Sequence, residues 1–108
     1  LSNVMRSGVT SLAKSLSQQL AAEGIRVNNL VPGAINTDRL RGLMQTQADR
    51  TGRPFEEISK ARAATVPMGR FGEADEFGQA GAFLLSDAAA YITGETLVVD
   101  GGAMKTVW

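Results

Sequence analysis

Few residues of this chain could do chemistry, because its 108 residues include no His and no Cys. Without imidazoles or thiols the sequence offers no Ser-His-Asp triad, Cys nucleophile, disulfide or His/Cys metal site, and we expect no bound metal. The most suggestive polar group is Asn36-Thr37-Asp38, which follows Pro32-Gly33. From the residues alone, Pro-Gly predicts the end of a strand, and the polar triplet predicts the cap of the next helix. A ligand-binding loop at the same place remains the alternative.

The composition excludes several classes of partner. Eleven Lys and Arg balance eleven Asp and Glu, so the net charge is zero. Strong non-specific binding to nucleic acid or to an anionic membrane is therefore not expected. No apolar run approaches the roughly 20 residues of a membrane span. The lack of Cys fits a cytoplasmic protein.

The elements that must position the Pro-Gly loop begin with a predicted helix over residues 1–23. Its apolar residues recur at steps of three and four, and Gly24 is suited to a left-handed helix cap. Residues 25–31 then alternate in the manner of a short strand, which Pro32-Gly33 closes. A helix, a tight turn and a strand in this order form the second half of a βαβ unit.

The remaining elements are predicted to be mostly helical. Residues 38–64 form a weaker helical pattern that is interrupted at 51–54, so a second short helix is expected over 55–64. A turn-rich connector over 66–72 leads to a helix over 73–86, and 96–99 is predicted to be a strand. In the helix over 73–86, Phe77, Phe83 and Leu84 are the candidates for the core.

The order helix, strand, helices, helix, strand predicts an α/β fold. A long helical crossover between two strands makes them parallel and, in our interpretation, adjacent. Two short parallel strands are not a self-sufficient sheet. The sequence therefore predicts the carboxyl-terminal part of an open α/β sheet, whose other strands lie in a missing N-terminal half or in a companion chain. That the first residue is Leu rather than Met agrees with this expectation.

Three segments of the chain carry specific motifs, which read IRVNNLVPGAINTD at 25–38, VPMGRFGEADEF at 66–77 and FLLSDAAAYITGETLVVDGG at 83–102. In this order they resemble the short-chain dehydrogenase/reductase family, and most closely its 3-oxoacyl-acyl-carrier-protein reductase branch. The resemblance implies a Rossmann-type doubly wound parallel sheet. It further implies that residues 1–108 are the C-terminal segment of a single NAD(P)-binding Rossmann-like domain, with the Gly-rich fingerprint upstream. It also implies hydride transfer between NAD or NADP cofactors and a small-molecule carbonyl or secondary alcohol.

The same resemblance implies a nicotinamide-binding role for the loop after the first strand. Pro32, Gly33, Ile35 and Thr37 match the family's Pro-Gly loop. By this resemblance, the backbone around Ile35 meets the nicotinamide carboxamide, Thr37 makes a further hydrogen bond, and Gly33 allows a close approach to the ring. Capping by Thr37 and cofactor binding can both hold.

The family's catalytic Tyr-x-x-x-Lys pair is where this sequence departs from the pattern. Aligned on Pro32-Gly33 without gaps, Ser2 takes the Tyr position and Arg6 takes the Lys position. A Ser hydroxyl is a weaker acid than a phenol, and Arg does not readily release a proton. One hypothesis keeps Arg6 near the cofactor ribose and Ser2 facing the substrate. The alternative is a non-catalytic, oligomer-forming relative.

The resemblance further implies self-association. In the family, the helix equivalent to residues 1–23 and the last strand with its helix both lie in contacts between subunits, so a homodimer or homotetramer is expected. The segment alone, lacking the fingerprint half, is not expected to be active.

Overall fold

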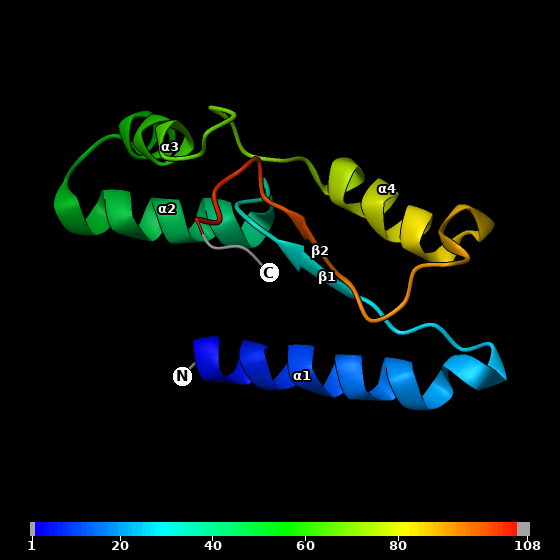
Figure 1. The fold of residues 1–108 in the computed structure, drawn as a ribbon. Coiled ribbons are helices and arrows are strands. Elements are labelled where there is room, and N and C mark those ends of the chain that lie inside the picture. The colour runs from blue at the N-terminus through cyan, green and yellow to red at the C-terminus, as the bar shows by residue number, and fades with distance from the viewer. Residues whose placement is uncertain (1, 106–108) are drawn as a thin grey trace. The chain divides into compact units, whose positions relative to one another are not determined.

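The computed structural model describes residues 2–105, with side chains described from residue 7 onward. It contains four helices, two 3-10 turns and two strands (Figure 1), in the order α1 (Ser2–Leu20), η1 (Ala21–Glu23), β1 (Asn29–Pro32), α2 (Asp38–Thr51), α3 (Phe55–Ala64), α4 (Ala74–Leu85), η2 (Asp87–Ala89) and β2 (Thr96–Val99). The strands pair directly. They are parallel, because the bonds Asn29 N–H to Glu95 O and Gly33 N–H to Val99 O advance together along both chains. The predicted strand pairing is thus confirmed.

The chain divides into two compact units, which are described separately. The first contains residues 2–31 and 80–98, and the second contains residues 32–79 and 99–105.

In the first unit, side chains hold the segment between α1 and β1. Gly24 ends the preceding helical turn with a φ of 79°, as predicted. The Arg26 guanidinium donates to the carbonyl oxygens of Leu84 and Ile92, at 2.7 and 3.1 Å. Val27 N–H donates to the Thr93 hydroxyl at 3.0 Å. Val27 O accepts from Gly94 N–H at 2.8 Å. Because these partners lie at the end of α4 and in the loop before β2 rather than in a strand, regular pairing begins only at Asn29, four residues later than the predicted start at residue 25.

One face of α4 packs against β1 in this unit. A Cβ atom on Gly81 would lie 3.3 Å from Leu30 Cδ2, which shows how closely the helix approaches the strand. Leu84, one turn further along the same face, is buried. Phe83 points off that face and is 43% exposed, so its prediction as a core residue is wrong in this structure.

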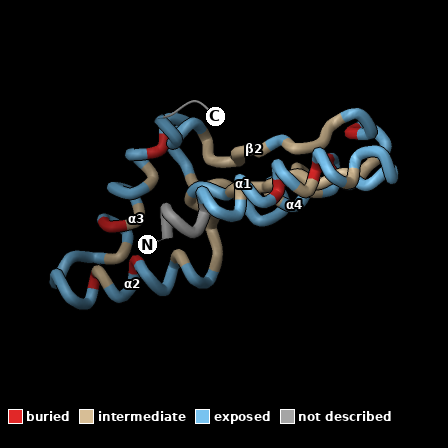
Figure 2. The backbone as a smooth tube through the Cα atoms, turned by 60° about the horizontal axis from the view of Figure 1, so that its bottom comes forward, coloured by how far each residue is buried: buried red, intermediate tan, exposed pale blue. Residues whose placement is uncertain are grey.

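The core of the second unit lies between α2 and α3. Thr37 caps α2 as predicted, since its hydroxyl accepts a hydrogen bond from Leu40 N–H at 3.3 Å. Gly52 ends the same helix in the left-handed conformation. Figure 2 shows buried positions on both helices; the core consists of Met44, Ala48 and Ile58, with Leu40, Phe55 and Phe71 packed against it.

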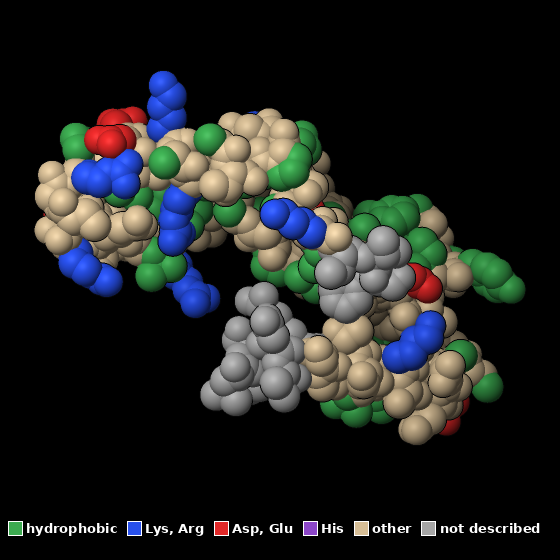
Figure 3. All heavy atoms as spheres, turned by 60° about the vertical axis from the view of Figure 1, so that its left-hand side comes forward, with side chains coloured by type: hydrophobic (Ala, Val, Ile, Leu, Met, Phe, Trp, Pro, Cys, Tyr) green, Lys and Arg blue, Asp and Glu red, His purple; other side chains and the backbone are tan. Residues whose placement is uncertain are grey.

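On the face shown in Figure 3, Lys and Arg side chains are separated by other residues and form no continuous patch. Within residues 2–105 no helix has both the length and the apolar character needed to cross a bilayer.

Candidate functional site

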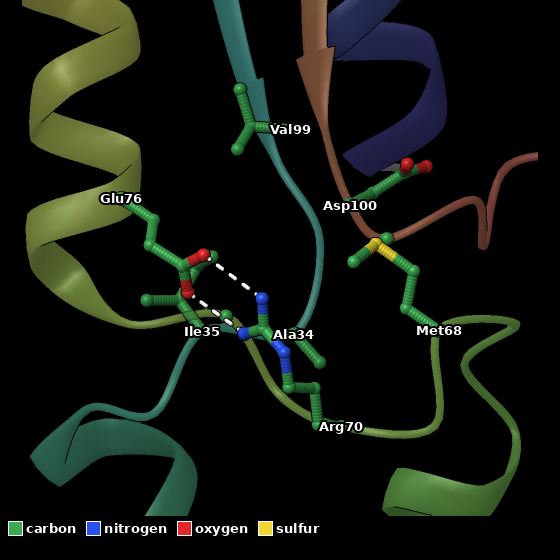
Figure 4. A pocket seen from close by; sticks show the side chains of 9 residues that line it. Ala34, Ile35, Met68, Arg70, Glu76, Val99 and Asp100 are labelled. Atoms are coloured by element: carbon green, nitrogen blue, oxygen red, sulfur yellow. Dashed lines mark hydrogen bonds and ion pairs between the residues drawn. The ribbon is translucent and has the colours of Figure 1, made fainter.

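Three loops of the second unit meet beyond the carboxyl ends of β1 and β2. They are the loop after β1 (residues 33–37), the connector between α3 and α4 (residues 65–73) and the turn after β2 (residues 100–102). Together with the first turn of α4 they form a small, partly open cavity of about 110 Å³ (Figure 4), which is lined by Ala34, Ile35, Met68, Arg70, Gly72, Glu76, Val99, Asp100 and Gly101. This edge is where open parallel sheets bind ligands.

Gly33 follows β1 at a point where no side chain fits. Its N–H donates to Val99 O at 2.9 Å, which extends the strand pairing by one residue. A Cβ atom at this position would lie 2.5 Å from the Asp100 Cβ. The close approach that Gly33 permits in this structure is therefore to the end of β2.

Ile35 lies opposite Gly72 in an isolated parallel bridge. Gly72 N–H donates to Ala34 O at 3.0 Å, and Gly72 O accepts from Asn36 N–H at 2.7 Å. In such a bridge the residue between the two bonded neighbours turns its own N–H and C=O away from the partner strand. Among the described residues neither of these Ile35 groups has a hydrogen-bond partner. The loop thus presents one backbone donor and one acceptor on the side away from the connector.

This pair of groups fits a primary carboxamide, which carries one acceptor oxygen and an NH₂ donor. Thr37, two residues further, uses a lone pair of its hydroxyl to cap α2 and keeps the hydroxyl proton to donate. The residues that the resemblance assigns to the nicotinamide therefore suit that group chemically, and Thr37 can also be a helix cap.

Arg70 in the connector forms a two-bond ion pair with Glu76 in the first turn of α4. The distances from Arg70 Nη1 and Nη2 to the two Glu76 carboxylate oxygens are 2.8 and 2.9 Å, as the dashed lines in Figure 4 mark. Glu76 Oε1 also accepts from Glu73 N–H at 2.9 Å, which caps the helix. The Arg70 hydrogen bonds, together with the bond from Glu73 N–H, lower the pKa of Glu76 from 4.5 to about 2. The same Glu76 carboxylate raises the pKa of Arg70.

A second polar chain joins the loop after β1 to the starts of two helices. Asn36 Oδ1 accepts from Arg41 Nη1 at 2.6 Å, while Asn36 Nδ2 donates to Glu73 Oε1 at 3.5 Å. Arg41 is also paired with Asp38. Asn36 thereby lies between the first turn of α2 and the start of α4.

The predicted site residues divide into two groups. Pro32, Gly33, Ile35 and Thr37 lie in or beside one loop at the ends of the strands. Ser2 and Arg6 belong to α1, but their side chains lie outside the described residues, so their assignment stays a prediction.

Sequence reasoning missed Gly72, Arg70 and Glu76 as parts of this site. The available signal was the acidic start of the last helix, which is typical of a helix N-terminus and gave no hint of the pairing with Arg70. Within the described residues no group of three acidic side chains is arranged to bind a metal ion.

Comparison with known sequences identifies relatives of this chain. A family model described as enoyl-(acyl carrier protein) reductase matches residues 1–104. The 3-oxoacyl-acyl-carrier-protein reductase FabG of Escherichia coli (strain K12) is 46% identical over 97 residues, which cover 90% of this chain and 35% of that protein.

Comparison with solved structures also identifies dehydrogenases and reductases. A short chain dehydrogenase family protein from Francisella tularensis superposes with a TM-score of 0.88 at 34% identity, over 93% of this chain and 41% of its own. The L-sorbose reductase of Gluconobacter frateurii, complexed with NADPH and L-sorbose, does so with a TM-score of 0.90 at 28% identity, over 97% and 40%. These matches confirm the predicted α/β fold class, and the chain spans roughly two fifths of each of these two structures. The chain belongs to the short-chain dehydrogenase/reductase family, and within it resembles the 3-oxoacyl-acyl-carrier-protein reductases.

Proposed function

We propose that residues 1–108 are the C-terminal segment of a single NAD(P)-binding Rossmann-like domain, in a protein that transfers a hydride between NAD(P)(H) and a carbonyl or secondary alcohol. The observation that carries the proposal is the backbone donor and acceptor of Ile35, which have no partner within residues 2–105 and are held at the carboxyl edge of two parallel strands. Reductase names among the relatives, and the NADPH in one neighbouring structure, support it. When bound, NADPH or NADH supplies the hydride.

In this proposal the segment orients the nicotinamide. The N–H and C=O of Ile35 bind the carboxamide, and the Thr37 hydroxyl donates to the same group. Pro32 and Gly33 set the position of this loop, because they fix where β1 stops against β2. Ser2 faces the substrate and Arg6 binds ribose hydroxyls, as the resemblance implies.

The test is titration of the full-length protein with NADPH and with NADH, followed by calorimetry or by Trp fluorescence. We expect saturable binding of at least one of the two. No saturable binding of either would reject the proposal.

A non-catalytic relative is the second candidate, because Ser2 and Arg6 replace the Tyr and Lys of the family pair. The double variant Ser2→Tyr/Arg6→Lys separates the candidates. If the natural protein reduces a panel of carbonyl compounds as fast as the double variant, the non-catalytic candidate fails. If only the double variant turns over, the natural protein binds cofactor without catalysis.

We also infer a homodimer or homotetramer. In α1, Val9 and Leu12 lie three residues apart on one face and are 59% and 60% exposed in this structure. An exposed apolar pair on a long helix favours association with a like surface. Light scattering of the natural protein and of Leu12→Glu tests this; a smaller assembly is expected for the variant, with Lys14→Glu, also on α1, as its control.

A further inference from the structure

The Arg70–Glu76 pair closes a short segment of chain. The guanidinium and the carboxylate join the two ends of residues 70–76 through two parallel hydrogen bonds, a geometry that fixes orientation as well as distance. The bond from Glu73 N–H to Glu76 pins the middle of the segment to the same carboxylate. Arg70 Nη1 further donates to Phe71 O at 3.1 Å.

Gly72 lies inside this closed segment and is the only bridge partner of the loop after β1 among the described residues. Its N–H and C=O hold Ala34 and Asn36 on either side of Ile35. A Cβ atom on Gly72 would be 2.9 Å from Ile35 Cδ1, so the two chains are in close contact as well as hydrogen-bonded. A displacement of Gly72 would therefore be passed directly to Ile35.

We propose that Arg70 and Glu76 are positioning residues, which clamp Gly72 and thereby set the direction in which the Ile35 N–H and C=O meet the nicotinamide carboxamide. This inference rests on the proposed function. In this proposal both side chains act through the Gly72–Ile35 bridge rather than by direct contact with the cofactor. Figure 4 shows the pair beside Ile35 and Ala34 at the edge of the cavity.

The Arg70–Glu76 ion pair stays charged on both sides near neutral pH. The charged and titratable groups that face Glu76 are Arg70 and Glu73, and the bonds from Arg70 and from the Glu73 backbone keep the Glu76 carboxyl ionised. Both side chains of the pair are about half exposed, so its contribution is reduced by solvent and by salt.

The experiment measures NADPH and NADH dissociation constants of the full-length protein and of three variants, Arg70→Gln, Glu76→Gln and the double variant. Gln at position 76 still accepts the Glu73 N–H bond, so the cap is kept while the ion pair is lost. We expect each single variant to weaken binding about two- to fivefold, and the double variant to be no weaker than either single one. The kcat at saturating cofactor should change less than KM.

Two further variants make the result specific. Glu57→Gln breaks the pair between Arg53, just before α3, and Glu57 in its first turn, whose contact is also 2.9 Å and whose side chains are similarly exposed. This variant should leave the cofactor dissociation constant unchanged. Arg70→Lys keeps the charge without the two-pronged geometry and should fall between the natural protein and Arg70→Gln. Arg70→Lys also replaces Arg70→Gln as the test variant if Arg70→Gln fails to fold.

The outcomes are distinct. If the natural protein binds neither dinucleotide, the proposed function and the clamp fall together. If it binds and folded Arg70 and Glu76 variants bind equally well, only the clamp is overturned. A loss of affinity that matches that of Glu57→Gln, or that adds up in the double variant, would also overturn it.

Discussion

Gly33 and Asp100 lie closer together than any two residues with side chains could at these positions. A Cβ atom on Gly33 would be 2.7 Å from the Asp100 Cα and 2.5 Å from its Cβ. The Asp100 carboxylate meanwhile accepts hydrogen bonds from Gly102 N–H and Met104 N–H, at 2.9 and 2.8 Å. These two hydrogen bonds fix the end of β2 through the residues that follow it. The loop after β1 must therefore leave room for Asp100.

The first prediction follows from this contact. Gly33→Ala should lower the free energy of unfolding of the full-length protein by about 1–3 kcal/mol, because the added methyl group forces the strand ends apart. Gly42→Ala is the matched control, since a Cβ there meets open space within the described residues and Ala favours the helix by roughly 0.5–1 kcal/mol. Denaturant unfolding of both variants checks the signs; equal effects would contradict the contact.

Arg26 gives a second prediction, in the first unit. Arg26→Met keeps the apolar stem but leaves the partly buried Leu84 carbonyl without its 2.7 Å donor, which should cost about 1–3 kcal/mol of unfolding free energy. Ile92 O is less affected, because Asn28 Nδ2 also donates to it at 3.1 Å. Lys14→Met removes only an exposed 3.4 Å contact and should change stability by less than about 0.5 kcal/mol. Thermal denaturation of Arg26→Met and Lys14→Met, compared with the natural protein, tests this prediction.

The third prediction concerns pH. The folded pKa of Glu76 is lowered from 4.5 to about 2, so its ionised form stabilises the fold above the unfolded value, and that contribution disappears as the pH falls through the folded value. The melting temperature of the natural protein should therefore exceed that of Glu76→Gln by a constant margin above pH 4.5. Below it the margin should shrink and should vanish near pH 2. A margin that does not depend on pH would contradict the ion pair as its source.

Thr37 gives a fourth prediction, which separates capping from cofactor binding. Thr37→Ser keeps both the cap and the hydroxyl proton and should change little. Thr37→Asp keeps the cap acceptor but has no proton to donate, so stability should be retained while NADPH affinity falls about fivefold or more. Thr37→Val should lose roughly 1 kcal/mol of stability as well. Calorimetric titration and melting curves of the same samples test this, and unchanged affinity in Thr37→Asp would remove Thr37 from the cofactor site.

Several local features could be predicted from the sequence. The left-handed turn at Gly24, the Thr37 cap and the bounds of β2 at 96–99 all agree with the structure. Each depends on residues adjacent in the chain or one helical turn apart, so their chemistry can be recognised without knowledge of the fold. The family and the parallel pairing also followed, because the motif order and the long crossover are properties of the sequence.

The start of β1 could not be predicted in this way. Residues 25–28 have the alternation of a strand, but Val27 N–H bonds the Thr93 side chain, and Arg26 bonds carbonyl oxygens at the end of α4 and in the loop before β2. These partners lie more than fifty residues away along the chain. Phe83 illustrates the same difficulty, because helical periodicity does not specify which side of α4 faces β1.

By itself, then, the sequence determined the family, the order of the elements and the loop that carries Ile35 and Thr37. Only the tertiary structure decided which way the Ile35 backbone groups point and that Gly72 holds them there. It also decided that Arg70 pairs with Glu76 and that Gly33 accommodates Asp100. The physical reason is that hydrogen bonds and van der Waals contacts act over a few ångströms in space, and no local pattern specifies which distant segments will come that close.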